Sequence, residues 1–180
     1  MTIVDGNAIF YFLKELPPNF KSICEKIFDK AIRGYYSVFS TDMYFENSIK
    51  SLERIRRGCG EKLIISGPNV KKHVDWKSFL TNEENKRQLI EMLVQVWSSE
   101  PFMPKLVSKD VIINNEDQAI LLTSDNGENI QKTVIRELCS DQEETDTRVI
   151  LYCNYAQRIG YMLESKAPIA TSFSSIYTMH

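Results

Sequence analysis

The sequence predicts an α/β fold, a three-layer sandwich with a mostly parallel central sheet. Two kinds of segment that alternate along the chain predict this class. Short runs of β-branched and aromatic residues alternate along the chain with longer segments whose apolar residues recur at helical spacing. Such alternation of strands and helices is typical of parallel sheets, whose strands are joined by helical crossovers. The length of 180 residues suits one domain, and 43% hydrophobic with 26% charged residues is an ordinary globular composition.

The first part of the chain predicts two buried strands with a helix between them. Residues 2–4 are Thr-Ile-Val, a β-branched run that ends at Asp5. Residues 20–32 have apolar side chains at helical spacing. Residues 35–40, Tyr-Tyr-Ser-Val-Phe-Ser, predict the second strand, which leads into Asp42. Each predicted strand is therefore followed closely by an acid.

The middle of the chain predicts mainly helix. Residues 47–58 are rich in bases and predict a helix or a partly ordered arch, and residues 60–75 predict a loop. A long amphipathic helix is expected from Trp76 or Glu83 to about Trp97, because its apolar residues lie on one side.

The last part of the chain predicts a strand followed by two helices. Residues 117–124 resemble a strand, and residues 127–138 are expected to be helical. Ser140 and Glu143 have the spacing of a capping box, which predicts the start of another helix. Gly160 is expected to end this helix, with a final parallel strand after it.

Composition excludes several classes of protein. A net charge of −2 argues against a protein that coats nucleic acid by bulk charge, although a local basic patch remains compatible with it. The four cysteines are scattered and there are two histidines, which argues against a structural zinc site. No apolar run approaches the ~20 residues of a membrane span, and the N-terminus lacks the pattern of a signal peptide. We expect no membrane partner and an intracellular location, nuclear or cytoplasmic.

Acids from three points in the sequence are expected at one edge of the sheet. Asp5 and Asp42 each follow a predicted strand, and Glu143, Glu144 and Asp146 stand at the start of a predicted helix. Sites in parallel α/β sheets lie beyond the carboxyl ends of the strands. Clustered carboxylates repel one another unless a cation joins them, and Mg²⁺ or Mn²⁺ prefers oxygen ligands. The alternative is that these acids form a turn, a helix cap and a stabilised helix N-terminus.

A basic segment follows Asp42. Lys50, Arg54 and Arg57 have i, i+4, i+7 spacing, which would place them on one face of a helix. Such a face could contact a phosphate backbone beside a metal site. The alternative is a solvated charged surface.

Three stretches together resemble a known family. They are "IVDGNAIFYFL" (residues 3–13), "VFSTDMYFENSIKSLERIRRG" (residues 38–58) and "SDQEETDTRVILYCNYA" (residues 140–156). In order and spacing they resemble the PIN-like, flap-endonuclease-like (5′ nuclease) superfamily. More narrowly, they resemble a group of uncharacterised, transposon-associated animal proteins with this domain. The resemblance extends from residue 3 to about residue 161. It implies metal-dependent hydrolysis of phosphodiesters, with a DNA flap or a single strand as the nucleic-acid partner.

The resemblance also implies which residues bind metal and substrate. Asp5 and Asp42 match the first two metal-binding acids. Glu144 and Asp146 match the acidic pair at the start of the next helix, with Glu143 and Asp146 as the alternative pair. Mg²⁺ or Mn²⁺ is the implied cofactor.

Lys50 and Arg57 match the basic pair that such nucleases place near the scissile phosphate. The C-terminal part departs from the resemblance, since members of the superfamily continue with an Asp-x-Asp pair and an apolar strand. No Asp follows Gly160 here. Codons compatible with residues 165–175, read in a shifted frame, can encode Ser-Pro-Asp-Ser-Asp and a run of apolar residues. Our hypothesis is a change of reading frame between about residues 161 and 164, and the alternative is an unrelated natural C-terminus.

We therefore predict a truncated PIN-like nuclease domain over residues 1–163, without its last strand or strands, and an aberrant tail over residues 164–180. The resemblance then implies a Mg²⁺-dependent nuclease that is catalytically incomplete, and so inactive or weakly active. The alternative is a non-catalytic module that binds nucleic acid or another protein.

Overall fold

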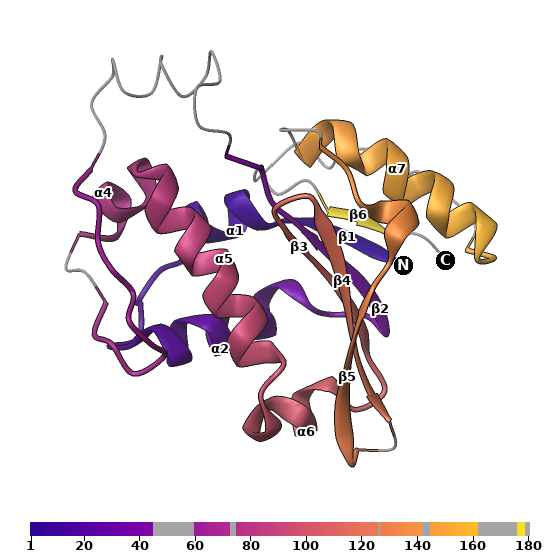
Figure 1. Ribbon diagram of the computed structural model, residues 1–180, viewed down its shortest axis with the longest axis horizontal. Coiled ribbons are helices and arrows are strands. Elements are labelled where there is room, and N and C mark those ends of the chain that lie inside the picture. Colours follow the sequence, from indigo (N-terminus) through magenta and orange to yellow (C-terminus); the bar gives the residue numbers. More distant parts are fainter. Residues whose placement is uncertain (45–59, 73–74, 126, 142–144, 162–175, 179–180) are drawn as a thin grey trace.

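In the part of the chain that the structure describes, six strands form one mixed sheet with helices on both faces (Figure 1). The computed structural model describes residues 1–44, 60–72, 75–125, 127–141, 145–161 and 176–178. The order of strands across the sheet is β5-β4-β3-β2-β1-β6. The predicted α/β class with three layers is confirmed.

The centre of the sheet is parallel and its margins are antiparallel. The parallel strands are β1 (Thr2–Asp5), β2 (Tyr36–Ser40) and β3 (Asp110–Asn115). The antiparallel strands are β4 (Gln118–Asp125) and β5 (Asn129–Val134) beyond β3, and β6 (Ile176–Thr178) beside β1. The carboxyl ends of β1, β2 and β3 therefore lie along the same edge of the sheet.

The connections between the parallel strands cover one face of the sheet. The larger helices of this layer are α1 (Gly6–Phe12), α2 (Phe20–Ala31), α4 (Trp76–Thr81) and α5 (Glu83–Trp97). Two short helices, η1 (Glu100–Phe102) and α6 (Met103–Leu106), lead into β3. On the opposite face lie η2 (Arg136–Leu138) and α7 (Thr145–Arg158). Among the described helices, none combines the length and the apolar character needed to cross a membrane.

Side chains along each strand point alternately to the two faces of the sheet, so the core is divided between the two layers of helices. Phe39 belongs to the large cluster beneath α2 and α5, and its neighbour Val38 belongs to the smaller cluster beneath α7. In β3, Val111 and Ile113 face the first cluster and Ile112 faces the second. Successive strand residues point to opposite faces, so a strand that is buried on both faces is a continuous apolar run. Burial of each such side chain contributes about 1.5–3 kcal/mol.

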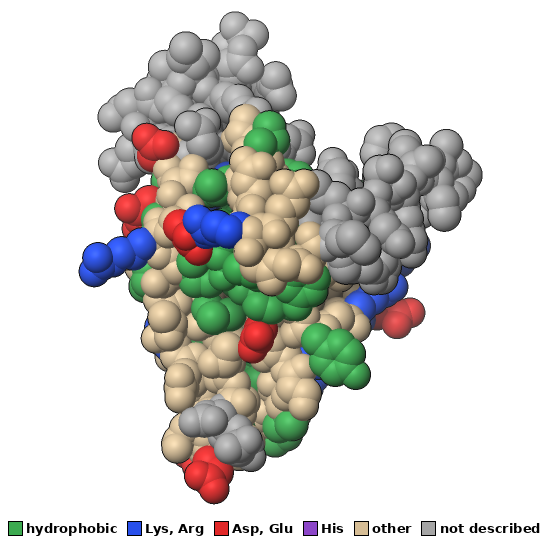
Figure 2. All heavy atoms as spheres, turned by 90° about the vertical axis from the view of Figure 1, so that its right-hand side faces the viewer, with side chains coloured by type: hydrophobic (Ala, Val, Ile, Leu, Met, Phe, Trp, Pro, Cys, Tyr) green, Lys and Arg blue, Asp and Glu red, His purple; other side chains and the backbone are tan. Residues whose placement is uncertain are grey.

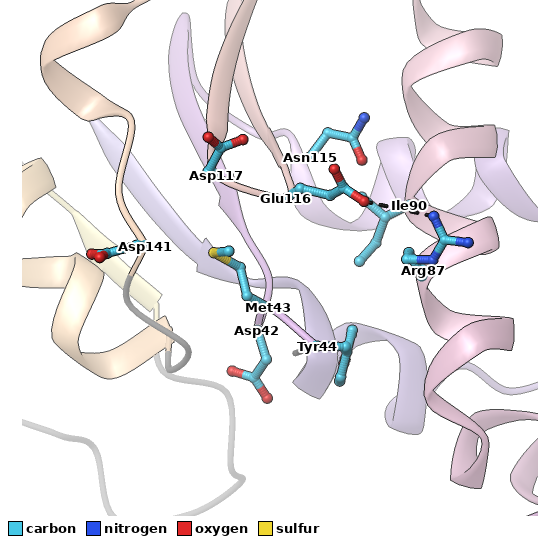
Figure 3. A pocket seen from close by; sticks show the side chains of 9 residues that line it. All are labelled: Asp42, Met43, Tyr44, Arg87, Ile90, Asn115, Glu116, Asp117 and Asp141. Atoms are coloured by element: carbon cyan, nitrogen blue, oxygen red, sulfur yellow. Dashed lines mark ion pairs between the residues drawn. The ribbon is translucent and has the colours of Figure 1, made fainter. Parts of the chain in front are cut away.

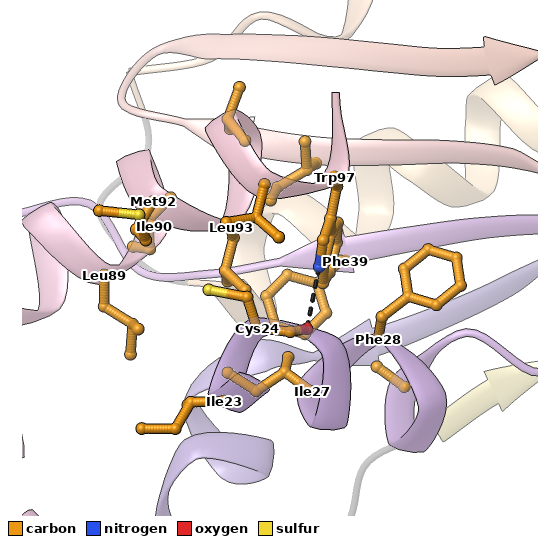
Figure 4. Close-up of a cluster of buried hydrophobic side chains, with 14 of the residues drawn as sticks. Ile23, Cys24, Ile27, Phe28, Phe39, Leu89, Ile90, Met92, Leu93 and Trp97 are labelled. Carbon is orange, nitrogen blue, oxygen red and sulfur yellow. Dashed lines mark hydrogen bonds between the residues drawn. The ribbon is translucent and has the colours of Figure 1, made fainter. Parts of the chain in front are cut away.

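Trp97 at the end of α5 is central to the large cluster (Figure 4). Its indole N–H donates to the carbonyl oxygen of Cys24 in α2 at 3.0 Å, and its ring centroid lies 5.4 Å from that of Phe39 in β2. The indole satisfies its one donor inside the core, as a buried tryptophan requires. Trp97 thus joins two helices to the sheet.

Side-chain caps explain where the helices begin. The side chain of Asn19 accepts from the backbone N–H of Ser22 at the start of α2. Asn82 accepts from the backbone N–H groups of Glu84 and Asn85 at the start of α5. The long helix predicted from Trp76 or Glu83 is therefore two helices, because Asn82 ends α4 and caps α5.

The prediction of a helix over residues 127–138 is wrong. This segment forms β5 and then the short helix η2. Gly127 has a φ of +78° in the connection between β4 and β5, and the register pairs Ile120 with Val134. Ile130 and Val134 have a four-residue spacing that a helix would also allow, but pairing with β4 outweighs this local pattern.

Several other predictions concern the ends of elements and the tail. The predicted helix after Ser140 is described as α7 from Thr145, and Gly160 follows its end with a φ of +94°. Tyr152 and Ala156 are fully buried, whereas Ile159, which has the same helical spacing, is 40% exposed. The predicted arch over residues 47–58 lies outside the described residues. Within the predicted aberrant tail, β6 pairs with β1, and its direction is antiparallel where a parallel strand was expected.

Candidate acidic site at the carboxyl edge of the sheet

Three polar chain segments meet at the carboxyl ends of the parallel strands. Asp5 is the last residue of β1 and pairs with Ser40 of β2, so Asp42 follows two residues further along the same edge. Asn115 is the last residue of β3, and Glu116 begins the turn into β4. The predicted common edge for Asp5 and Asp42 therefore exists, and it also includes the end of β3.

A cavity of about 500 Å³ opens at this edge (Figure 3). Its acidic lining residues come from three segments: Asp42 after β2, Glu116 and Asp117 in the turn after β3, and Asp141 before α7. Its other lining residues are Met43, Tyr44, Arg87, Ile90 and Asn115. Four carboxylates and one guanidinium make the lining acidic in sum.

Asp42 connects the end of β2 to the start of α7. Its carboxylate accepts from the backbone N–H of Thr145 at 3.1 Å and from the Thr145 hydroxyl at 3.0 Å. Thr145 stands between Glu144 and Asp146 in the sequence. The structure therefore brings the segment of the predicted acidic pair to Asp42. Glu144 itself lies outside the described residues, and Asp146 is described only as part of the backbone of α7.

The Asp5 side chain also binds the start of a helix. Its carboxylate accepts from the backbone N–H of Ala8 at 3.1 Å, which caps α1. A role in the fold is thus seen for both carboxylates: Asp5 caps α1, where a simple turn was the alternative considered, and Asp42 binds the first described residue of α7 from a distant segment. It does not conflict with ion binding, because a carboxylate has about four lone-pair positions and each of these bonds uses one oxygen.

A buried lysine borders the edge on the side of α5. Lys86 is only 7% exposed, and its ammonium lies 4.4 Å from the centroid of the Tyr44 ring. The Tyr44 hydroxyl donates to the side-chain oxygen of Asn7 at 3.0 Å. The Asn7 amide nitrogen is buried and has no hydrogen-bond partner among the described residues. These contacts place a cation and an amide donor beside the acidic cavity.

Arg87 is held within a network of acids. Its guanidinium lies 2.7 Å from Glu84, 2.9 Å from Glu91 and 3.6 Å from Glu116. The hydrogen bond from Arg87 holds the pKa of Glu84 below its ordinary value. The contact with Glu116 is drawn in Figure 3 and links α5 to the turn after β3. Arg87 therefore orients one wall of the cavity.

Arg148 supports the opposite wall from α7. It is 1% exposed, and its Nη2 donates to the carbonyl oxygens of Glu116 at 3.1 Å and Ser140 at 2.8 Å. One buried guanidinium thus fixes the β3–β4 turn against the segment that leads into α7. The positive charge of the Arg148 guanidinium also offsets part of the repulsion among the acids that line the cavity.

The structure tests the predicted metal ligands only in part. Within the described residues, no group of three or more His, Cys, Asp or Glu side chains lies close enough to hold a metal ion. Glu143, Glu144, Lys50 and Arg57 lie outside the described residues. The metal site and the basic substrate-binding pair therefore remain predictions.

Glu116, Asp117 and Asp141 were not predicted as lining residues. The first two follow β3, a strand that was not predicted either. The pattern was present, since Val111, Ile112 and Ile113 form a β-branched run just before turn-forming polar residues. Lys86 and Arg148 could not be found in this way, because a basic residue in an amphipathic helix is usually exposed.

Comparison of the chain with family models, with curated proteins and with solved structures gave no match. The resemblance to PIN-like nucleases therefore rests on the quoted motifs alone and remains a prediction.

Proposed function

We propose that this chain is a nuclease-like α/β domain whose acidic edge binds a divalent cation together with the phosphodiester backbone of a DNA flap or single strand. The observation that carries the proposal is the pair of hydrogen bonds from Thr145 to Asp42. They hold Thr145, the first described residue of α7, at the edge where β1 and β2 end. Asp42, Glu116 and Asp141 come from three separate parts of the sequence and line one cavity at this edge, and oxygen ligands gathered in this way suit a hard cation.

Asp5, Asp42, Glu144 and Asp146 would hold Mg²⁺ or Mn²⁺ through carboxylate oxygens. When bound, such an ion lowers the pKa of a coordinated water and polarises a phosphoryl oxygen. The acidic cavity that Asp42 lines supports a positively charged ion as the ligand. Its other acids, Glu116, Asp117 and Asp141, add to the negative potential that attracts a cation.

Lys50 and Arg57 would bind the nucleic-acid backbone. On the face that Figure 2 shows, the basic side chains of the described residues are scattered among acids and do not form a continuous patch. Together with the net charge of −2, this favours local recognition of phosphate over binding by bulk charge. The affinity for nucleic acid should then depend on few contacts and weakly on salt concentration.

We propose weak hydrolysis or none, because residues 161–180 contain no Asp. An Asp-x-Asp pair would supply the far side of a two-ion site, and one ion held from one side stabilises the leaving oxygen poorly. The alternative function is a non-catalytic binding module. The observation that favours it is that Asp5 caps α1 and Asp42 binds the start of α7, which gives each acid a role in the fold without any metal.

Cleavage of labelled flap and single-stranded DNA in Mn²⁺ tests the proposal. Two proteins are compared: this chain, and a version whose residues after 163 are replaced by the shifted-frame sequence with its Asp-x-Asp pair. We expect Mn²⁺-dependent cleavage by the second protein, and at least 100-fold slower cleavage by the first. Lys50→Ala in the active version is expected to weaken DNA binding. Absence of cleavage by both proteins, with both folded, would favour the binding module.

A further inference from the structure

A second cavity, of about 250 Å³, lies at the opposite edge of the sheet. It is lined by residues at the amino ends of β2 and β3, at the end of β4 and just beyond the end of α7. The lining residues of this tyrosine cavity are Tyr35, Tyr36, Ser108, Lys109, Asp110, Ser124 and Tyr161. None of them takes part in the acidic site.

Tyrosine rings form the apolar part of this lining. The ring centroids of Tyr36 and Tyr161 lie 5.7 Å apart with the planes tilted by 52°. The Tyr36 hydroxyl is 3.2 Å from that of Tyr155, which fixes the Tyr36 ring against α7. Tyr35 is 81% exposed. The faces of such rings carry negative electrostatic potential and attract cations.

A carboxylate without a cationic partner completes the lining. The side chain of Asp110 makes no ion pair or hydrogen bond with any other described residue, and burial raises its pKa. Asp110 pairs with Tyr36 across the parallel strands, so both side chains lie on the face that α7 covers. The ammonium of the neighbouring Lys109 lies 5.2 Å from the Phe28 ring centroid, in the layer on the other face. A partly buried carboxylate of this kind is stabilised by any cation that enters.

Ser124 adds a second unused polar group. Its hydroxyl oxygen is buried and has no hydrogen-bond partner among the described residues. Buried polar groups are normally paired, and an exception calls for an explanation such as a bound ligand. Ser124 lies on the same face of β4 as Leu122 of the large cluster, whereas Asp110 lies on the face that α7 covers, so the two groups line the cavity from opposite faces and the ligand proposed below uses Asp110 alone.

We propose that the tyrosine cavity binds an organic ammonium that keeps at least one N–H, as in the side chain of dimethyllysine. Its methyl groups would contact the rings of Tyr35, Tyr36 and Tyr161, and its N–H would donate to Asp110. A trimethylammonium carries the same charge but has no N–H, and an acetylated lysine has no charge. The cavity should therefore prefer the dimethylated form to either. This site is independent of the proposed nuclease-like function.

Isothermal titration of the full chain with N-acetyl-dimethyllysine amide tests the proposal. We expect saturable binding, at least threefold weaker binding of the trimethylated compound, and at least tenfold weaker binding of the Nε-acetylated compound. The dimethylammonium ion alone is titrated in parallel. If it binds as tightly as the amide, the site takes free amines; if it binds more weakly, the site recognises the lysine stem as well.

Three variants assign the binding to this cavity. Asp110→Asn removes the charge and is expected to weaken binding at least tenfold. Tyr35→Ala removes an exposed ring that the core does not need, and is expected to weaken binding several-fold even if Asp110→Asn fails to fold. Asp117→Asn, at the opposite edge, is the control and should bind as the parent does. Equal binding of the acetylated compound, an unaffected Tyr35→Ala, or no binding by the folded parent would overturn the proposal.

Discussion

Individual residues at the acidic edge combine a role in the fold with a proposed role in ion binding. Asp5 ends β1 and caps α1, and Asp42 follows β2 and binds the start of α7. These hydrogen bonds hold each carboxylate in one orientation. Restricted side chains lose less conformational entropy when they bind an ion, so helix capping here would favour binding.

Gly6 shows how tightly this edge is packed. A Cβ atom at this position would lie 2.6 Å from carbons of the Phe39 ring and 2.7 Å from the Thr41 methyl group. We expect Gly6→Ala to lower the free energy of unfolding by about 1–3 kcal/mol, because the ring and β2 must shift. Urea unfolding followed by circular dichroism measures this.

Gly67→Ala is the matched control for Gly6→Ala. A Cβ at Gly67 meets no atom within 4 Å, and we expect the stability to change by less than about 0.5 kcal/mol. Equal unfolding midpoints for the two variants would contradict the described packing of Gly6 on Phe39.

At the scale of elements, α2 and α5 pack together in the large cluster, and the hydrogen bond from Trp97 to Cys24 is one of the contacts that join them. We expect Trp97→Phe to keep ring contacts in the core but to lose the hydrogen bond to Cys24 and part of the buried volume. The expected cost is about 1–3 kcal/mol of unfolding free energy. Thermal and urea unfolding measure it. A variant as stable as the parent would show that this hydrogen bond contributes nothing to the packing of the two helices.

Local pattern was enough to predict some elements and not others. The buried strand over residues 35–40 and the helix over residues 20–32 could be predicted, since each has one dominant period and a clear end. β5 could not, because Ile130 and Val134 have helical spacing and only β4 makes the segment a strand. Cross-strand pairing depends on contacts with another segment, so the sequence of one strand alone predicts it poorly.

The candidate site was predictable to a similar extent. Asp5 and Asp42 could be placed at one edge because Asp5 ends β1 and Asp42 lies two residues after the end of β2. Lys86 and Arg148 could not be placed, because their burial depends on contacts with distant segments. For example, Arg148 binds the carbonyl oxygen of Glu116, which is 32 residues away in the sequence.

At the scale of the whole molecule, β6 covers one margin of the sheet. Ile3 of β1 pairs with Tyr177 and Val4 with Ile176, and both β1 residues are almost fully buried. If residues 162–180 are removed, the outer edge of β1 loses this pairing. Unpaired apolar edge strands promote association between molecules.

We therefore expect a variant that ends at residue 161 to self-associate where the full chain is monomeric or less associated at the same concentration. Sedimentation velocity at several concentrations measures this. Identical distributions for the two proteins would mean that β6 does not protect the edge.

The central claim is that the acidic edge binds a divalent cation, and Asp42 tests it most directly. Asn retains an oxygen that can accept from Thr145 but carries no charge, whereas Ala retains neither. The measurement is Mn²⁺ binding by isothermal titration, alongside the free energy of unfolding without metal. We predict that Asp42→Asn stays within about 0.5 kcal/mol of the parent but binds Mn²⁺ at least tenfold more weakly, and that Asp42→Ala also loses about 1 kcal/mol of stability. No Mn²⁺ binding by the folded parent, or equal affinity in Asp42→Asn, would contradict the account.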